Sequence, residues 1–471
     1  MTTTAVLGDA TIQELRESIR GAVVTQADDG YDSARSVWNG AIDRKPAVIA
    51  RCAGTADVIA AVRFARSQDL VIAVRGGGHN VAGFGTCDNG MVIDLSPMKG
   101  IRVDPASHTV RAQGGVVWGE LDHETQPFGL ATTGGLVTST GIAGFTLGGG
   151  IGWLMRQHGL AADNLISADV VTANGELVNA SEDENADLLW ALRGGGGNFG
   201  VVTSFEYRLH KVGPTVYGGA VFYPADQATD LLRFYAAWTK ELPDELTTVF
   251  VFLTAPPEPF IPAELQGTPM VGIACCHTGT TAEGERALQA LKDFGTPAAD
   301  VIGPIPYTAL QGMSDASAPR GIHTYWKTQY LADLGDDAID VVVEHAAEMP
   351  NLFPLSGIHI HHLEGAVRQQ PDGGSAFSHR DNRFVLNIIG MWMDDAHAGT
   401  HVDWTRRMWD AVRPHATGDP YLNFLGDEGT DRVRAAYGDD TFNRLVALKD
   451  RFDPTNVFRL NQNIPPSRSA D

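Results

Sequence analysis

Val71-Ile72-Ala73-Val74-Arg75-Gly76-Gly77-Gly78-His79-Asn80 runs from a β-branched segment through three glycines to a single histidine. The β-branched residues suit a covered, pleated surface and predict a buried strand. Glycines let the backbone N–H groups at the end of that strand approach an anionic ligand closely. Arg75 is expected to add a positive charge at the mouth of the loop, and His79 to lie against the ligand. Taken alone, the stretch also fits a glycine-rich turn with an incidental histidine.

The length and composition of the chain restrict its fold and partners. A chain of 471 residues is too long for one ordinary core, which predicts two domains or one large composite domain. The net charge of −22 disfavours nucleic acid, anionic membrane surfaces and polyanionic substrates. The sequence shows neither the apolar run of a signal peptide or membrane span nor, with four cysteines, a disulfide framework. These features predict a cytoplasmic protein without a membrane segment.

Two further glycine-rich segments follow the first. Residues 132–164 contain closely spaced glycines between positions 141 and 152, which interrupt any long helix and indicate close approach of the backbone to a bulky ligand. Residues 195–200 match the G-x-G-x-x-G pattern of dinucleotide-binding proteins. However, a predicted helix precedes this pattern and a predicted strand follows it, the reverse of the order in the Rossmann fingerprint. A nicotinamide cofactor is therefore disfavoured.

The pattern of elements predicts an α+β fold. Short strands and helices alternate before residue 214, whereas residues 216–420 are expected to form an antiparallel sheet with helices on one face. The predicted strands of this second part are 248–254, 270–276, 358–362 and 384–392, and its predicted helices are 226–241, 281–294 and 337–348. A helix over 431–451 and an extended segment over 458–465 are expected to close the chain.

Several motifs together resemble the berberine-bridge-enzyme-like family of flavoprotein oxidases, within the vanillyl-alcohol-oxidase superfamily. The matching segments occur in family order along nearly the whole chain: Arg75-Gly-Gly-Gly-His79-Asn80, Gly148-Gly-Gly-Ile-Gly-Trp153, Gly159-Leu-Ala-Ala-Asp-Asn164, Asn198-Phe-Gly-Val-Val202, and Phe452-Asp-Pro-Thr-Asn456 through Asn461-Gln-Asn-Ile-Pro465. The resemblance implies a PCMH-type FAD-binding domain of two α/β subdomains over residues 43–213, after a helical lead-in over 1–42. It also implies a substrate-binding domain over 214–419 and a segment over 420–471 that completes the FAD domain.

The resemblance also implies how FAD is held. His79 occupies the position that in this family bonds through a ring nitrogen to the flavin 8α carbon, and a neutral imidazole is a competent nucleophile near neutral pH. The cysteine that makes a second link in many relatives corresponds to Val137, so a single histidyl link is expected. Thr140 replaces the Val or Leu that relatives often place beside the route of oxygen. The residues implied to bind FAD are Arg75, Gly76, Gly77, Gly78, His79, Asn80, Gly83, Val137, Thr138, Thr140, Gly141, Gly144, Asn164, Gly200, Val202, Tyr421, Asn423, Asn461 and Asn463.

The catalytic base of the family is not retained. Relatives that oxidise sugars and alcohols use the last tyrosine of a Tyr-x-Asn-Tyr segment, which here reads Tyr421-Leu-Asn-Phe424, and a phenyl ring cannot accept a proton. Tyr421 itself is expected beside the flavin. Substrate-facing candidates are His361, which alternation places on one strand face with His359, and Asn387, a polar residue in an apolar run. The His-x-His pattern has no evident third ligand, so no metal site is expected.

The favoured function is that of an FAD-dependent oxidoreductase, an oxidase that takes a hydride from a C–H next to nitrogen or oxygen of a small molecule onto flavin N5. Reoxidation by O2 or by another acceptor, the identity of the substrate and the oligomeric state stay open at this point. An amine donor needs less help from a base than an alcohol, because no O–H proton has to be removed. The alternative is a flavin-containing protein of secondary metabolism that binds its ligand, or cyclises it, without redox turnover.

Overall fold

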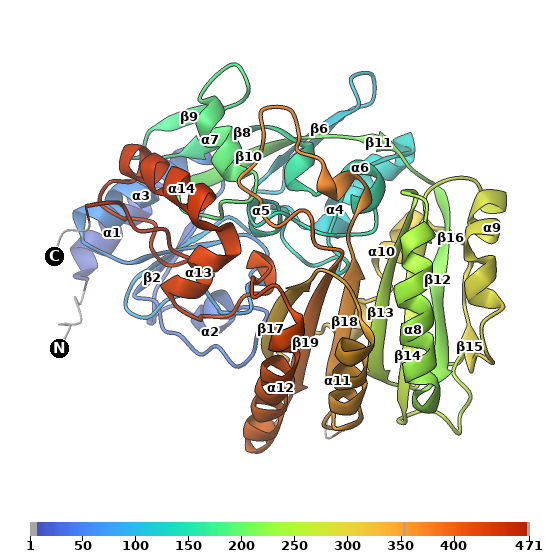
Figure 1. Ribbon diagram of the computed structural model, residues 1–471. Coiled ribbons are helices and arrows are strands. Elements are labelled where there is room, and N and C mark those ends of the chain that lie inside the picture. Colours follow the sequence, from blue (N-terminus) through green and yellow to red (C-terminus); the bar gives the residue numbers. More distant parts are fainter. Residues whose placement is uncertain (1–6, 352–354, 469–471) are drawn as a thin grey trace.

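A computed structural model describes residues 7–351 and 355–468 (Figure 1). Its first elements are α1 Asp9–Ser18, β1 Ala22–Val24, α2 Tyr31–Arg35, β2 Val48–Arg51, α3 Thr55–Ser67, β3 Ile72–Arg75 and β4 Met91–Asp94. The strands form a sheet in the order β1-β2-β4-β3, in which β2, β4 and β3 run parallel. Parallel neighbours need a crossover connection, and α3 supplies it between β2 and β3 with its apolar face buried.

A second sheet completes the first part of the chain. The elements that follow are β5 Ile101–Asp104, β6 Thr109–Gln113, α4 Trp118–Thr125, β7 Leu130–Ala131, α5 Ile142–Leu147, α6 Met155–His158, β8 Leu165–Val171, β9 Leu177–Ala180, α7 Ala186–Leu192 and β10 Val201–Arg208. The sheet has the antiparallel order β5-β6-β10-β8-β9, and its core is shared with α4, α5 and α7. The two sheets with their helices are the paired α/β subdomains that the resemblance implied.

The glycine-rich segments lie between these elements rather than inside long ones. Residues 195–200 follow helix α7 and precede strand β10, the order that disfavoured a Rossmann fingerprint. Helix α5 ends at Leu147, and the next residues include Gly149 at φ +108° and Gly150 at φ +88°. Residues with side chains rarely adopt this conformation, so the glycines end α5 and turn the chain toward α6.

The second part of the chain forms the expected antiparallel sheet. Its elements are β11 His210–Lys211, β12 Thr215–Pro224, α8 Ala228–Trp238, β13 Leu246–Thr254, β14 Pro269–His277, α9 Thr281–Lys292, β15 Ala299–Asp300, β16 Gly303–Pro306, α10 Tyr307–Gln311, β17 His323–Leu331, α11 Asp336–Ala347, β18 Gly357–His362, β19 Phe384–Trp392 and α12 Ala398–Val412. The eight-stranded sheet has the order β15-β12-β14-β13-β18-β19-β17, with β16 beside β12. Helices α8, α11 and α12 cover one face (Figure 1). The other face packs against the first part of the chain.

The C-terminal segment corrects one prediction. Instead of one helix over 431–451 there are two, α13 Thr430–Tyr437 and α14 Asp439–Phe452, separated by Gly438 at φ +71°. Helix α14 returns to the first part of the chain, where the fully buried Lys449 pairs with Asp453 at 2.6 Å and donates to the Asn198 carbonyl at 2.8 Å. A buried ammonium is tolerated only with such partners, so this contact fixes the closing segment.

The bounds of the four predicted units remain predictions, and their outer ends at 1–6 and 469–471 lie outside the described residues. Strands β12 and β17 and helix α12 were not predicted from the sequence, whereas β19 has the predicted limits. Among the helices of the described chain, none combines the length and the apolar character that crossing a membrane requires.

Candidate active site

A cavity of about 370 Å³ lies where the two parts of the chain meet, a size typical of small-molecule sites. The first part contributes main chain from several loops and from helix α5, which we call the glycine wall: Gly76, Gly77, Gly78, Gly141, Gly144, Gly148, Gly196, Gly197 and Gly200. The second part contributes side chains from three strands, which we call the strand wall: Trp326, His359, His361, Asn387, Ile389 and Met391. Trp38, His79, Tyr421 and Phe424 also line the cavity.

Glycines of the glycine wall serve two different purposes. A Cβ on Gly77 would lie 2.3 Å from the backbone nitrogen of Gly141, and a Cβ on Gly141 would lie 2.4 Å from that of Gly77. These two loops therefore touch through their main chains, which only glycine permits. A Cβ on Gly144 or Gly197 would meet no atom of the described residues within 4 Å, although both glycines line the cavity. The second pair therefore leaves room that a bound molecule can fill.

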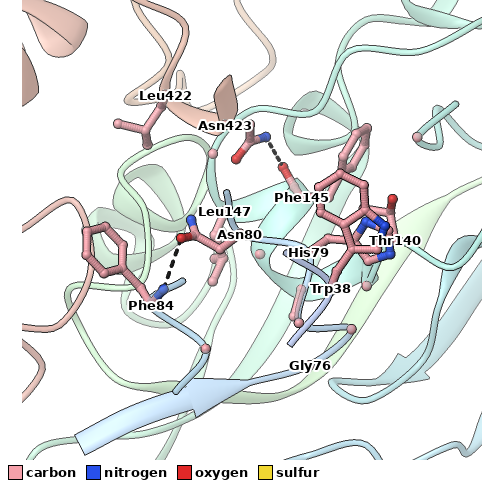
Figure 2. A pocket seen from close by; sticks show the side chains of 18 of the residues that line it. Trp38, Gly76, His79, Asn80, Phe84, Thr140, Phe145, Leu147, Leu422 and Asn423 are labelled. Atoms are coloured by element: carbon pink, nitrogen blue, oxygen red, sulfur yellow. Dashed lines mark hydrogen bonds between the residues drawn. The ribbon is translucent and has the colours of Figure 1, made fainter. Parts of the chain in front are cut away.

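His79 lies in the cavity lining beside Trp38 (Figure 2), and its ring has a second neighbour in Ser139. The Trp38 ring stacks on that of His79, with centroids 5.0 Å apart and planes 16° apart, and Ser139 Oγ lies 2.8 Å from Nε2. Burial, with a smaller contribution from the charge of Arg320, lowers the pKa of His79 to about 4. The imidazole is therefore neutral at neutral pH. Because Ser139 engages Nε2, Nδ1 is the ring nitrogen left available for another bond.

Arg75 borders the same loop, but its charge is compensated. Its Nη2 lies 2.9 Å from Asp94 Oδ2, and both side chains are buried. Burial acts to raise the pKa of Asp94, but the charge and hydrogen bonds of Arg75 and Ser96 outweigh it and hold that pKa below its usual value. The expectation of a free positive charge at the loop mouth is thus corrected, because the charge of Asp94 cancels it. Arg75 therefore presents little net charge to an anionic group at this loop.

Tyr421 has a ring in the cavity lining and a hydroxyl committed elsewhere. The hydroxyl oxygen accepts hydrogen bonds from the backbone nitrogens of Gly150 and Ile151, at 3.0 and 3.2 Å, and from Asn423 Nδ2 at 3.0 Å. Burial raises the pKa of Tyr421 to about 12, although these hydrogen bonds act to lower it. The side chain therefore holds the segment that follows α5, and its phenol is no proton acceptor at neutral pH.

The strand wall places three predicted polar residues around the cavity. His359 lies directly opposite Asn387 in the antiparallel pairing of β18 with β19, and His361 follows on the same face of β18. Burial lowers the pKa of His359 to about 4, and burial together with the neighbouring His359 lowers that of His361 to about 3. Both imidazoles are therefore neutral. His362, on the opposite face as alternation predicted, lies 2.7 Å from Glu364.

Four of the residues implied to bind FAD lie outside the cavity lining. Thr138 donates hydrogen bonds from its backbone nitrogen and hydroxyl to Asp315, at 2.8 and 2.6 Å. Asn164 donates to the Leu160 carbonyl at 2.9 Å and lies 2.6 Å from His210 Nε2, so it stabilises the turn before β8. The other two are Gly83, at φ +74°, and Asn463. His361 and Asn387 also line the cavity, from strands β18 and β19 of the second part of the chain. The remaining residues implied to bind FAD lie together in the lining: Arg75, Gly76, Gly77, Gly78, His79, Asn80, Val137, Thr140, Gly141, Gly144, Gly200, Val202, Tyr421, Asn423 and Asn461.

Two residues beside His79 were missed from the sequence. Trp38 lies in a segment outside helices and strands, and its Nε1 donates to the Ala318 carbonyl at 2.9 Å, which bridges the two parts of the chain. No motif surrounds Trp38, so no signal was available. Ser139 lies between Val137 and Thr140, which the resemblance had already placed near the flavin, and that position was a usable signal.

Comparisons with known proteins show that the chain is an FAD-binding oxidoreductase. Residues 46–181 match the family described as FAD binding domain, and residues 420–465 match the family described as Berberine and berberine like. An FAD-linked oxidoreductase of Dictyostelium discoideum is 34% identical over 461 residues, which cover 97% of this chain and 97% of the relative. The chain belongs to the berberine-bridge-enzyme-like family of FAD-linked oxidoreductases.

Characterised relatives agree with this assignment. The (R)-6-hydroxynicotine oxidase of Paenarthrobacter nicotinovorans is 31% identical over 459 residues, covering 96% of this chain and 98% of the relative. The crystal structure of 6-hydroxy-D-nicotine oxidase from Arthrobacter nicotinovorans superposes with a TM-score of 0.86 at 28% identity, covering 96% of this chain and 99% of that one. Both relatives match nearly the whole chain, which agrees with its place among the FAD-linked oxidoreductases.

The residues of the cavity fit FAD. Gly144 and Gly197 leave space along the glycine wall, where a Cβ would meet no described atom. Asn461, in the same lining, has a buried Oδ1 that no described residue satisfies. A large planar cofactor with hydrogen-bonding edges can fill that space and pair with that oxygen.

Proposed function

We propose that FAD is attached through a single bond to His79 Nδ1 and that the enzyme oxidises a small molecule bound against the strand wall. When bound, FAD supplies the acceptor for a hydride from a C–H of the substrate. The observation that carries the attachment is the environment of His79: a neutral ring with Nε2 engaged by Ser139 and Nδ1 available. A neutral imidazole with a fixed orientation is a nucleophile that needs no prior deprotonation.

The surroundings of His79 support one link rather than two. Trp38 stacks on the ring and limits its rotation, which keeps the same nitrogen turned outward. Val137, which also lines the cavity, has no atom able to bond to a carbon of the flavin. The cysteines all lie elsewhere and are buried, and burial raises the pKa of each thiol.

The candidate residues of the site have two different roles: some contact the substrate, and one positions the main chain. His361 and Asn387 line the cavity with a buried polar atom each and are proposed to contact the substrate. Tyr421 is proposed to act by position, because its hydroxyl holds the main chain at Gly150. The low pKa of His361, about 3, keeps its ring neutral and makes it a weak base, so its role is to form a hydrogen bond.

Acid precipitation of the purified yellow protein tests the attachment. We expect the pigment to stay with the precipitated wild-type protein and to pass entirely into the supernatant after His79→Ala. His123→Ala, which changes an exposed histidine, is the matched control and should retain the pigment. Pigment released from the wild type would contradict the covalent bond.

Anaerobic mixing tests the redox function and the electron acceptor. Candidate substrates are added to the holoenzyme without oxygen, and the flavin absorbance band is followed. A substrate should bleach the band, and admission of air should restore it if O2 is the acceptor. A bound substrate that leaves the band unchanged would favour a protein that binds or cyclises its ligand without redox turnover.

A further inference from the structure

The strand wall carries three buried polar atoms that no described residue satisfies: His361 Nε2, Asn387 Oδ1 and Trp326 Nε1. They come from the neighbouring strands β18, β19 and β17, and all three residues line the cavity. A buried polar atom without a partner costs about 1–3 kcal/mol. Three such atoms around one cavity indicate a ligand that satisfies them.

The chemistry of these atoms selects the polar group of that ligand. Asn387 Oδ1 only accepts a hydrogen bond, the indole nitrogen of Trp326 only donates one, and the neutral imidazole of His361 does either according to its tautomer. A hydroxyl group both donates and accepts, so it can pair with any of the three. A carbonyl oxygen cannot donate to Asn387, and an ammonium group cannot accept from Trp326.

The side chains of the lining offer no unpaired charge to an ionised substrate. Within residues 7–351 and 355–468, no aspartate, glutamate or lysine lines the cavity. Arg75 is the charged residue of the lining, and Asp94 already pairs with it. Moving an ammonium or carboxylate from water into such a site costs several kcal/mol, because no opposite charge compensates its lost hydration.

The walls around the polar atoms are aromatic. The rings of Trp326 and Phe424 meet edge to face at 5.5 Å, and the rings of His361 and Phe424 lie 5.6 Å apart. Trp38 meets Trp326 at 6.0 Å, so the aromatic surface extends from His361 to the ring that stacks on His79. Such surfaces favour a flat ring system over a flexible or strongly hydrated molecule.

We propose that the substrate is an uncharged molecule with a flat ring system and a free hydroxyl group, which His361, Asn387 and Trp326 bind. This inference rests on the proposed function, because it concerns the same cavity. A hydroxyl-bearing substrate differs from the amine that the loss of the tyrosine base, taken alone, favoured. An amine is protonated at neutral pH, and this lining provides no carboxylate for it among the described residues.

Four probes on one ring system test the inference with the flavin-loaded enzyme. They are 2-naphthalenemethanol and the counterparts that carry an aminomethyl, a carboxyl or a methyl group. Binding is measured at pH 7 without oxygen, from the change in the flavin absorbance spectrum. We expect the alcohol to bind at least tenfold more tightly than each of the other three. Equal or tighter binding of the ammonium or carboxylate probe, or no binding of the alcohol, would overturn the proposal.

Variants assign the effect to the strand wall. His361→Phe and Asn387→Leu should each weaken binding of the alcohol at least fivefold and change binding of the methyl probe less than twofold. His123→Ala, which changes an exposed histidine outside the cavity lining, should alter neither affinity. Equal weakening of all four probes in both polar variants would contradict the assigned contacts. Flavin content is measured first, because a chain that takes up no flavin contradicts the proposed function, whereas a loaded chain that prefers the ammonium contradicts only this inference.

Discussion

Whereas the glycine wall presents main chain from loops and from helix α5 of the first part of the chain, the strand wall presents side chains from β17, β18 and β19. The glycine wall depends on contacts as close as that of Gly77 with Gly141, which leave little freedom to the sequence. The strand wall depends on alternation along strands, which fixes the face of a residue but not its type. The difference teaches that close approach of the main chain restricts the first wall to glycine, whereas the second wall can change its side chains without a change of fold.

Two glycine substitutions test the first half of the comparison with the largest expected effects. Gly77→Ala would place its Cβ 2.3 Å from the Gly141 nitrogen, so it should lower the free energy of unfolding by at least about 2 kcal/mol and abolish flavin uptake. Gly144→Ala adds a Cβ that meets no described atom within 4 Å, so it should not lower the free energy of unfolding of the flavin-free chain, while weakening flavin binding more than tenfold. Thermal unfolding and flavin titration measure both. Equal destabilisation of the flavin-free chain by the two variants would contradict the division of the glycines.

The contact between the two parts of the chain should weaken as pH rises. Asp122 of α4 is buried and accepts a hydrogen bond from Gln311 of α10 at 2.9 Å, and burial raises its pKa to about 7. A carboxyl with a raised folded-state pKa stabilises the fold fully below pH 4, and this stabilisation is lost as pH rises through about 7. We expect the free energy of unfolding to fall on the order of 4 kcal/mol over this range. In Asp122→Asn this fall should be absent, and an unchanged pH profile in the variant would contradict the assignment.

A smaller effect is expected at the residue that orients His79. Ser139→Ala removes the hydroxyl 2.8 Å from His79 Nε2. The lost hydrogen bond is worth about 1 kcal/mol, so covalent attachment of the flavin should slow about fivefold because the ring is less well oriented. Ser139→Thr keeps a hydroxyl and should restore most of the rate. The bound fraction is followed by flavin fluorescence of the denatured protein after adding FAD to flavin-free enzyme. Equal rates in the wild type and in Ser139→Ala would show that the hydroxyl does not orient the ring.

The smallest effect of pH is expected on the affinity of the strand wall for its ligand. Burial lowers the pKa of His359 to about 4 and that of His361 to about 3, so both remain neutral throughout the range from pH 5.5 to 9. The affinity for 2-naphthalenemethanol should therefore change less than twofold across that range. A loss of affinity on acidification with a midpoint near 6.5, the ordinary pKa of histidine, would show that these rings are hydrated and ionise freely.

The sequence predicted the glycine wall more completely than the surroundings of the substrate. The loop from Arg75 to Asn80 and the place of Phe424 follow from local motifs. Alternation placed His361 on one strand face, and Asn387 was selected as a polar residue in an apolar run. Trp38 could not be predicted, because its stacking on His79 depends on how two distant parts of the chain meet. The ion pair of Arg75 with Asp94 was missed for the same reason, since β3 and β4 pair side by side across a loop. The break of the last helix at Gly438 was available in the sequence as a glycine inside a helical pattern.

Peptide mapping of the purified flavin-loaded protein tests the central claim most directly. After proteolysis and mass spectrometry, the peptide that contains His79 should carry the mass of one covalently bound flavin, and fragmentation should place it on that histidine. An unmodified His79 peptide from yellow protein, or flavin mass on another residue, would contradict the account of the glycine wall.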